Sequence, residues 1–491
     1  MGTISSALSI MSQALNADQS ALNVVANNVA NASTPGYTEE TPTWQQNQPI
    51  EINGMSIGTG VVETGAVSQR DQVLEERLNQ QQQLASASGS RLAALNTVQA
   101  LFTPASGSSS STAGDIGSDL TGFFNSFSSL EANPTNNSLR EQVLSSASTL
   151  ASDVSNAAAS LNAQRSALDQ QAAGVAGQVN ALTSNLAQLN LQIQSTSPNA
   201  DAGTLEDQRQ QDLSQLSQLI GINQSKTENN GLVVTTTAGQ LLVSNGSNFQ
   251  LTTGTAGEVT HFFVGTADVT SQLASGGGSL GGDLTARDQD IPAVMASLDQ
   301  LAYNVSTQVN SLNNAGIDAN GATGAAVSAS TTGAMTLDIF SRPPSQVANQ
   351  TSGGDNVSGS AASMSVVMTD PSQVSAAALG KGTGDNSNTV AMAALASQSI
   401  VDGQSPSNFY SNFVSTLGST VSKVQIENTA QNASVTQLQT QNDSLSSVNL
   451  NDEASAMTTL ERSYQAASQV FTMLNTVIAS ALNLGDQTAV S

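Results

Sequence analysis

The sequence predicts an elongated, multidomain α+β protein in which the two chain ends form an α-helical coiled coil, beside a helical-bundle domain with an inserted antiparallel β region. Three observations predict this fold class. Apolar residues near both termini recur three and four positions apart, and a seven-residue apolar repeat runs through the middle of the chain. Two further internal segments have the composition of strands and turns rather than of helices.

The N-terminal segment is predicted to be an amphipathic helix. Its apolar residues fall on one narrow stripe: Ile4, Leu8, Met11, Leu15, Leu22, Val25 and Val29. The helix is expected to end before Pro35, because the residue before a proline is pushed out of helical geometry and Gly36 permits a positive φ. A polar, extended stretch then continues to about Ser68, with alternation typical of short strands at 50–52 and 60–62.

The C-terminal segment carries a second narrow stripe: Leu450, Met457, Leu460, Tyr464, Ala467, Phe471, Leu474, Ile478 and Leu484. Short isolated helices are marginal in water, so each end needs a partner. We expect the two ends to pair with each other and then with neighbouring copies, and to be mobile in the free monomer. Residues 1–68 and 446–491 are therefore predicted to form terminal coiled-coil segments with an adjoining extended region.

A helical body is predicted for 69–225, 283–317 and 388–445. The seven-residue repeat lies within the first of these ranges, at Val154, Leu161, Leu168, Val175, Leu182 and Leu189, and it must be covered by partner helices. Segments rich in Pro, Gly and Ser at 103–114 and 195–203 are predicted to be loops.

An inserted β-rich region is predicted for 226–282 and 318–387. Runs such as 232–237, 241–243 and 261–264, separated by Asn-Gly turns, indicate antiparallel strands. The glycine-rich stretch 276–282 has neither a phosphate-loop lysine nor dinucleotide-binding spacing, and is interpreted as a flexible hinge.

Composition argues against several classes of function. The formal net charge of -25 opposes binding to nucleic acid or to an anionic membrane surface. The absence of cysteine excludes disulfides and thiolate chemistry. The longest apolar run, 390–396, is far shorter than the ~20 residues of a membrane-spanning helix. No Lys or Arg precedes Arg70, so we expect any export to use a route without a secretory signal.

No catalytic residue, metal ligand or cofactor is expected. His261 is the only histidine and is interpreted as a strand residue, while Asp318-Ala319-Asn320-Gly321 lacks the further ligands of a calcium loop and is interpreted as a turn. An acid/base pair could be imagined among several C-terminal carboxylates, but these are expected on solvated helix faces: Glu427, Asp443, Asp452, Glu453 and Glu461.

A family resemblance begins in the segment 26–37, which contains Asn27, Asn28, Ala30, Asn31, Thr34, Pro35, Gly36 and Tyr37. This segment resembles the N-terminal motif of the axial proteins of the flagellum, namely rod, hook and hook-associated proteins. Four further segments resemble the FlgK family of first hook-filament junction proteins: 123–140, 205–209, 281–288 and 448–466. The departures are Thr38-Glu39-Glu40, where many relatives are basic, and the C-terminal extension 485–491.

The resemblance implies a non-catalytic structural subunit of the bacterial flagellum that serves flagellum assembly and motility. It implies secretion through the flagellar type III export apparatus and an extracellular location at the hook-filament junction, after a transient cytoplasmic stage. The implied partners are copies of the chain itself, the hook protein, the second hook-filament junction protein, and a cytoplasmic export chaperone that binds the C-terminal stripe. Neither nucleic acid nor membrane insertion is implied.

The sequence leaves three alternative functions to be weighed. A hook or rod protein would share the motif, but such proteins normally lack the long Gln-rich helical segment of about 140–220. A secreted coiled-coil adhesin would have no reason to carry axial motifs at both ends. A hydrolase is disfavoured because no nucleophile and base form a recognisable set.

Overall fold

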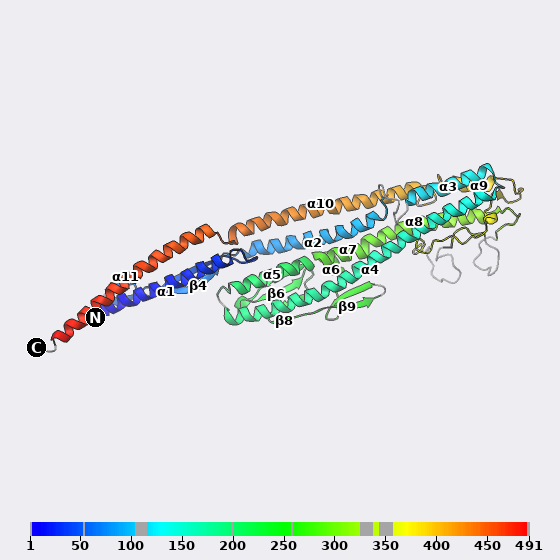
Figure 1. The fold of residues 1–491 in the computed structure, drawn as a ribbon. Helices are drawn as coiled ribbons and strands as arrows, with labels where there is room; N and C mark the ends of the chain where they lie inside the picture. Colours follow the sequence, from blue (N-terminus) through cyan, green and yellow to red (C-terminus); the bar gives the residue numbers. More distant parts are fainter. Residues whose placement is uncertain are drawn as a thin grey trace.

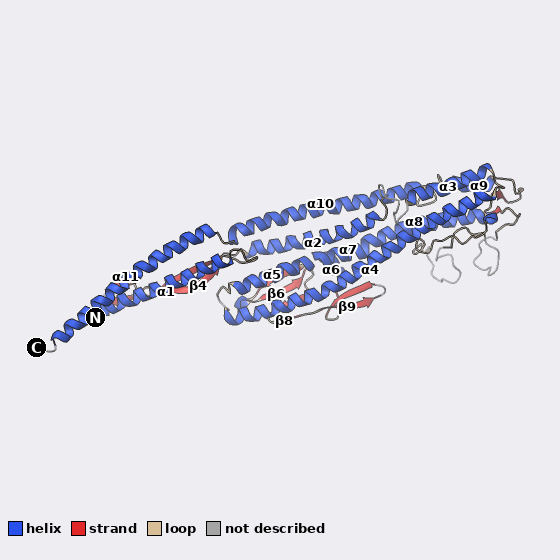
Figure 2. Ribbon diagram, viewed as in Figure 1, coloured by secondary structure: helices blue, strands red, loops and turns tan. Residues whose placement is uncertain are grey.

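The computed structural model describes residues 2–52, 55–103, 115–197, 200–256, 259–324, 337–342 and 357–488. The protein is an elongated α+β rod in which a helix pair at one end continues, with a bend, into a longer helical body (Figure 1). Both chain termini lie at the far tip of the helix pair. Helices dominate and strands form small sheets beside them (Figure 2), which confirms the predicted fold class.

The terminal segment comprises residues 2–68 and 447–488. Its helices α1 (Gly2–Asn31) and α11 (Leu450–Thr488) run antiparallel and pack on each other, which confirms that the two ends pair. A two-stranded ribbon of β1 (Glu40–Gln46) and β4 (Val61–Ser68) lies along α1, with Glu40 opposite Ser68. The hairpin of β2 (Ile50–Ile52) and β3 (Met55–Ile57) extends from it.

The body is built on α4 (Asn137–Thr196), a helix of 60 residues. Paired helices α2 (Gln72–Ala100) and α10 (Pro406–Ser446) run beside it, and α3 (Ile116–Ala132), α8 (Ile291–Ala315) and α9 (Ser387–Ala394) complete the end farthest from the termini. The core there is aromatic: the Phe123 ring lies 5.2 Å from that of Phe127 and 5.4 Å from that of Phe340.

A second core lies between the C-terminal half of α4 and the strands. One sheet has the order β5 (Ile222–Lys226), β6 (Leu232–Thr236), β7 (Leu241–Ser244), β8 (Ser247–Asn248), and the other joins β9 (Leu251–Ala256), β10 (Val259–Val264) and β11 (Ala267–Asp268). The predicted antiparallel strands are thus confirmed, although the first begins before residue 226. Asn245 has a φ of 51°, as an Asn-Gly hairpin turn requires.

The seven-residue repeat is covered within the chain. Val154, Leu161, Leu168 and Val175 are buried, whereas Leu182 and Leu189 are half-buried. Helices α3, α5 (Thr204–Leu219), α7 (Gly278–Thr285) and α8 each pack on part of α4. The predicted loop at 103–114 falls almost wholly outside the described residues, and α4 continues into the start of the predicted loop 195–203.

The interpretation of 276–282 as a flexible hinge is wrong. The segment includes the end of α6 (Thr270–Gly276) and most of α7 (Gly278–Thr285), which continues through a π-helical turn, 286–290, into α8. Its glycines permit close helix packing instead: a Cβ at Gly282 would lie 2.2 Å from the Ala87 carbonyl oxygen of α2. Next to it, Asp283 is buried and accepts a hydrogen bond from Ser90 of α2.

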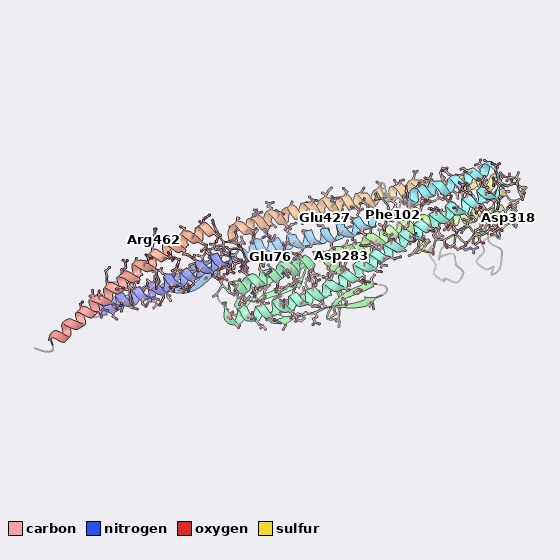
Figure 3. All side chains as sticks on the ribbon, viewed as in Figure 1. Glu76, Phe102, Asp283, Asp318, Glu427 and Arg462 are labelled. Carbon is pink, nitrogen blue, oxygen red and sulfur yellow. The ribbon has the colours of Figure 1, made fainter. Side chains whose placement is uncertain are left out.

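The described parts of 318–387 are mainly turns. They include β13 (Ala377–Ala378), which pairs with β12 (Gly316–Ile317), and a short 3-10 turn at Pro371–Gln373. Asp318 accepts hydrogen bonds from the backbone N–H groups of Asn320 and Ala322, so the interpretation of 318–321 as a turn is confirmed. Figure 3 places Asp318 at the end of the body opposite the terminal segment, which carries Arg462.

Candidate assembly site

The residues of the axial motif form a compact turn at the end of α1. Asn31 donates to the side-chain oxygen of Asn27 at 2.8 Å, and its own carbonyl accepts from the Thr34 N–H at 2.8 Å. Pro35 and Gly36 are exposed, with Gly36 at a φ of 80°, so the proline and glycine serve the backbone geometry of the turn. The turn directs the chain back along α1 as strand β1.

Asn28 is the hub of this region. Only 1% of its surface is exposed, and its side-chain N–H groups donate to the Glu40 carbonyl at 2.9 Å and to the Glu453 carboxylate at 2.8 Å. Its side-chain oxygen accepts from the Tyr37 hydroxyl at 2.8 Å and from the Glu40 N–H at 3.1 Å. One amide therefore joins α1, the turn, β1 and α11, and its hydrogen-bonding capacity is filled within the chain.

The environment of Glu453 differs from the one predicted from the sequence. The residue was expected on a solvated face, but it is 6% exposed and bonded to Asn28. Its other oxygen, Oε2, is buried and has no hydrogen-bond partner in the described part of the chain, and burial raises the pKa of this carboxyl. Burial likewise raises the pKa of Tyr37, so its hydroxyl keeps its proton at neutral pH and can donate to Asn28.

The predicted apolar stripes are only partly covered by the pairing of α1 with α11. In the N-terminal stripe Val25 is buried, Val29 is 40% exposed, and the others are half-buried: Ile4, Leu8, Met11, Leu15 and Leu22. In the C-terminal stripe Leu450 is 55% exposed, and the remaining described side chains are half-buried: Met457, Leu460, Tyr464, Ala467, Phe471, Leu474 and Ile478. The side chain of Leu484 lies outside the described set.

The best-buried seam of α1 contains two residues, Ala17 and Ala21, that the sequence pattern did not predict to be buried. It consists of Ala17, Ala21, Val25 and Asn28, which lie in the half of α1 nearest the body. Their spacing of three or four is helical, but small and polar residues were not counted as an apolar stripe. None of the described side chains in the outer half of α1, before Ala17, is fully buried.

A second apolar row on α11 remains exposed. Val470, Met473 and Val477 lie three and four positions apart, and Met473 is 61% exposed. An apolar groove adjoins this row, between α1, β4 and α11, and it is lined by Met11, Ala14, Ala17, Trp44, Val61, Leu460, Ala466, Ala467 and Val470, with polar residues at Asp18 and Ser463. Contiguous exposed apolar surface of this kind marks sites of association between proteins.

The described residues give little support for a metal site or a membrane-spanning segment. They contain no group of three or more His, Asp or Glu side chains that could hold a metal ion, and none of their helices is long and apolar enough to cross a membrane. His261 lies on strand β10 as expected, where its Nδ1 is 2.7 Å from an Asp268 oxygen. The two side chains are 27% and 44% exposed, and they lie on paired strands of a hairpin.

Comparison with known proteins agrees with this picture. Residues 8–38, which include the motif turn, match the family model of flagella basal body rod proteins, and residues 106–327 match that of the helical domain of the flagellar hook-associated protein FlgK. Flagellar hook-associated protein 1 of Escherichia coli K12 is 24% identical over 96% of this chain and 98% of its own length. The Bacillus subtilis 168 protein of that name is 23% identical, over 96% of each chain.

A solved structure has the same fold. The flagellar hook junction protein FlgK from Burkholderia pseudomallei superimposes with a TM-score of 0.61 at 19% identity, over 74% of this chain and 99% of the other. The helix pair, the motif turn and the matches together define a hook-associated structural protein of the bacterial flagellum. Within that class, the chain is similar to FlgK: residues 106–327 match the family model of its helical domain, and the curated relatives align over 96% of the chain.

Proposed function

We propose that this protein is a non-catalytic subunit that joins the flagellar hook to the filament by self-assembly through its terminal helices. The observation that carries the proposal is the absence of charged residues from the outer half of the terminal segment, which is the half farthest from the body. Residues 1–17 and 463–485 contain no Asp, Glu, Lys or Arg, in a chain whose formal net charge is -25. Copies that repel each other along their bodies can meet there without bringing like charges together.

The exposed row Val470, Met473 and Val477 supports the same proposal, since it is apolar surface that the chain does not cover itself. Burial of such a row against neighbouring copies would supply the missing stabilisation of the outer helix pair. In the free monomer the outer half is expected to be mobile, whereas the half near the body is held by Asn28.

The further steps of this proposal follow the family. The chain leaves the cytoplasm through the flagellar type III export apparatus, with a chaperone on the C-terminal stripe beforehand. It then contacts the hook protein on one side and the second hook-filament junction protein on the other, in an extracellular location. An uncovered amphipathic helix fits chaperone recognition, because its apolar face can lie in a groove of the partner.

A gene deletion with complementation tests the junction role. Cells without the gene are expected to carry bare hooks and to lose flagellin to the medium, and the wild-type gene should restore filaments. Normal filaments in the deletion strain would refute the proposal.

Complementation with variants tests the assembly surface. Met473→Asp with Val477→Asp places charges in the exposed row and should fail to restore filaments, because burying unpaired charge in an interface is costly. Gln469→Glu with Asn475→Asp adds the same charge at exposed polar positions of the same helix and is the matched control. Equal filament formation by both variants would show that the row does not take part in assembly.

A further inference from the structure

The junction between the terminal segment and the body is small. Two short connections join the parts covalently, Ser68–Gln72 between β4 and α2 and Ser446–Leu450 between α10 and α11. The helices and strands of the terminal segment pack chiefly on one another rather than on the body. With so little packed surface, relative motion of the two parts is the default expectation. The bend seen between them in Figure 1 therefore needs a specific cause.

Asp207 of α5 contacts the chain on both sides of the β1–β4 ribbon, whereas the connection at Ser446 is reached separately, by a hydrogen bond from the Glu39 N–H to the Ser446 carbonyl at 2.8 Å. One carboxylate oxygen accepts from the Thr38 N–H at 3.2 Å, just before β1. The other lies 2.6 Å from Arg70 Nη2, just after β4. A single carboxylate thus ties the start of β1 and the end of β4 to the same point of the body.

Asp201 makes a second tie beside it. Its carboxylate accepts from the Ser68 N–H at 2.7 Å and from the Ser68 hydroxyl at 3.0 Å, and it also accepts from the Gly203 N–H at 2.8 Å. Gly203 precedes α5 with a φ of 53°, and a Cβ there would lie 2.4 Å from a Glu40 carboxylate oxygen. The Glu40 side chain of the terminal segment therefore lies against the start of α5.

The helix that carries Asp207 is itself fixed to the body. Glu206 accepts from the Asn230 side-chain N–H at 2.6 Å, and Arg209 donates to the Asn230 carbonyl at 2.8 Å. Both side chains are buried. The segment 205–209, which resembles the FlgK family in sequence, thus has two faces: Glu206 and Arg209 hold α5 in the body, and Asp207 faces the terminal segment.

The Arg70–Asp207 pair is largely withdrawn from water. The side chains are 7% and 12% exposed, and the charged groups around them are Glu40, Glu75, Asp201, Glu206 and Arg209. Arg70 also lies 3.9 Å from Glu75, but Asp207 is the closer partner, and moving Arg70 away would leave the buried Asp207 carboxylate without its cation, which is costly. The pair therefore favours one geometry of the junction over others.

We propose that Asp207 is a positioning residue that, with Thr38, Arg70 and the Asp201–Ser68 tie, sets the angle between the terminal helix pair and the body. The role goes beyond self-assembly, because it concerns where each body lies once the terminal helices are packed. It is a property of the single chain and can be measured without a flagellum.

Distance measurement by pulsed electron paramagnetic resonance tests the proposal in the purified full-length chain. The natural sequence has no cysteine, so spin labels at Thr458→Cys on α11 and Gln188→Cys on α4 report the junction alone, and both positions are exposed. A second pair, Gln188→Cys and Ser434→Cys, lies within the body. Asp207→Ala is compared with Asp212→Ala, a change on the same helix at a carboxylate with no described bond to the terminal segment.

In the parent and in Asp212→Ala, the junction pair should give one narrow distance distribution. Asp207→Ala should widen that distribution about twofold or shift its maximum, as expected for a released hinge, while the body pair stays unchanged. An unchanged junction distribution in Asp207→Ala would overturn the proposal. Equal widening of the body pair would also overturn it, since Asp207 would then act on the body fold. Neither outcome bears on the junction role in cells, which the gene deletion tests separately.

Discussion

Replacing Asn28 by alanine should release the inner half of the terminal segment while leaving the body intact. Asn28 makes four hydrogen bonds, to Glu40 N–H and C=O, the Tyr37 hydroxyl and the Glu453 carboxylate. Alanine removes all of them and leaves their partners in a site that is closed to water, because Asn28 is 1% exposed.

The magnitude follows from these bonds. Each of the four bonds contributes about 1 kcal/mol net, so their loss should cost about 4 kcal/mol. The loss is local, since all four partners belong to the terminal segment. A change of about 4 kcal/mol corresponds to a change of roughly 1,000-fold in the opening equilibrium that exposes backbone amides.

Hydrogen exchange read by mass spectrometry is the appropriate assay. Protection of amides in 17–31 and 453–460 should fall by roughly 1,000-fold in Asn28→Ala, with protection of α4 unchanged. Tyr37→Phe removes one of the four bonds and should lower protection by about fivefold. Asn27→Ala is the matched control, since Asn27 is exposed and its side chain bonds only to Asn31, on the same helix.

Two results would refute this reasoning. If Asn28→Ala and Asn27→Ala changed protection of α1 equally, the hub would have no special role. If Asn28→Ala lowered protection across α4 as well, the terminal segment and the body would unfold together, and the assignment of the bonds to a local unit would be wrong.

Three further predictions concern other parts of the chain. Burial raises the pKa of the Glu75 carboxyl from 4.5 to about 7, so the folded state favours the protonated carboxyl. The stability that this preference contributes is fully present below pH 4.5 and is lost as the pH rises through about 7. Thermal melts should therefore show Glu75→Gln equal to the wild type near pH 4.5 and more stable by about 3 kcal/mol at pH 8, and a constant difference would contradict this. Gly282→Ala should lower the free energy of unfolding by about 1–3 kcal/mol, because its Cβ would meet the Ala87 carbonyl. Gly122→Ala, in open space on α3, should be neutral or stabilising. If chemical denaturation ranked the two variants in the opposite order, the close packing of α7 on α2 would be contradicted. In a strictly monomeric sample, amides of 2–15 should exchange much faster than those of 17–31, and equal protection would count against a mobile outer half.

Much of the secondary structure could be predicted from local patterns. Helix α1 ends at Asn31, shortly before Pro35 and Gly36, and strands β6 and β8 each follow an Asn-Gly pair, at 230–231 and 245–246. Patterns failed where a residue's role depends on a distant partner. Gly282 looked like part of a hinge because the carbonyl of Ala87, which requires its small size, belongs to another helix.

In the candidate site, too, local features could be predicted from the sequence and distant contacts could not. The motif around Asn28 and Tyr37 could be recognised from the sequence, but the hydrogen bond from Asn28 to Glu453 joins residues more than 400 positions apart. Glu453 has the local sequence of a solvated helix start, and only the approach of α11 to α1 removes it from water. The buried seam of Ala17 and Ala21 was missed because alanine packs where two helices come close, which depends on the partner rather than on apolar size.

The sequence by itself determined the amphipathic ends, the turn that ends α1, the uncharged stretches 1–17 and 463–485, and the strand segments. Each of these depends on the chemistry of neighbouring residues. Only the tertiary structure decided that the ends pair antiparallel, that Asn28 is their hub, and that Asp207 meets both Thr38 and Arg70. Those contacts join segments far apart in the chain, and their energies depend on burial and distance, which no local pattern specifies.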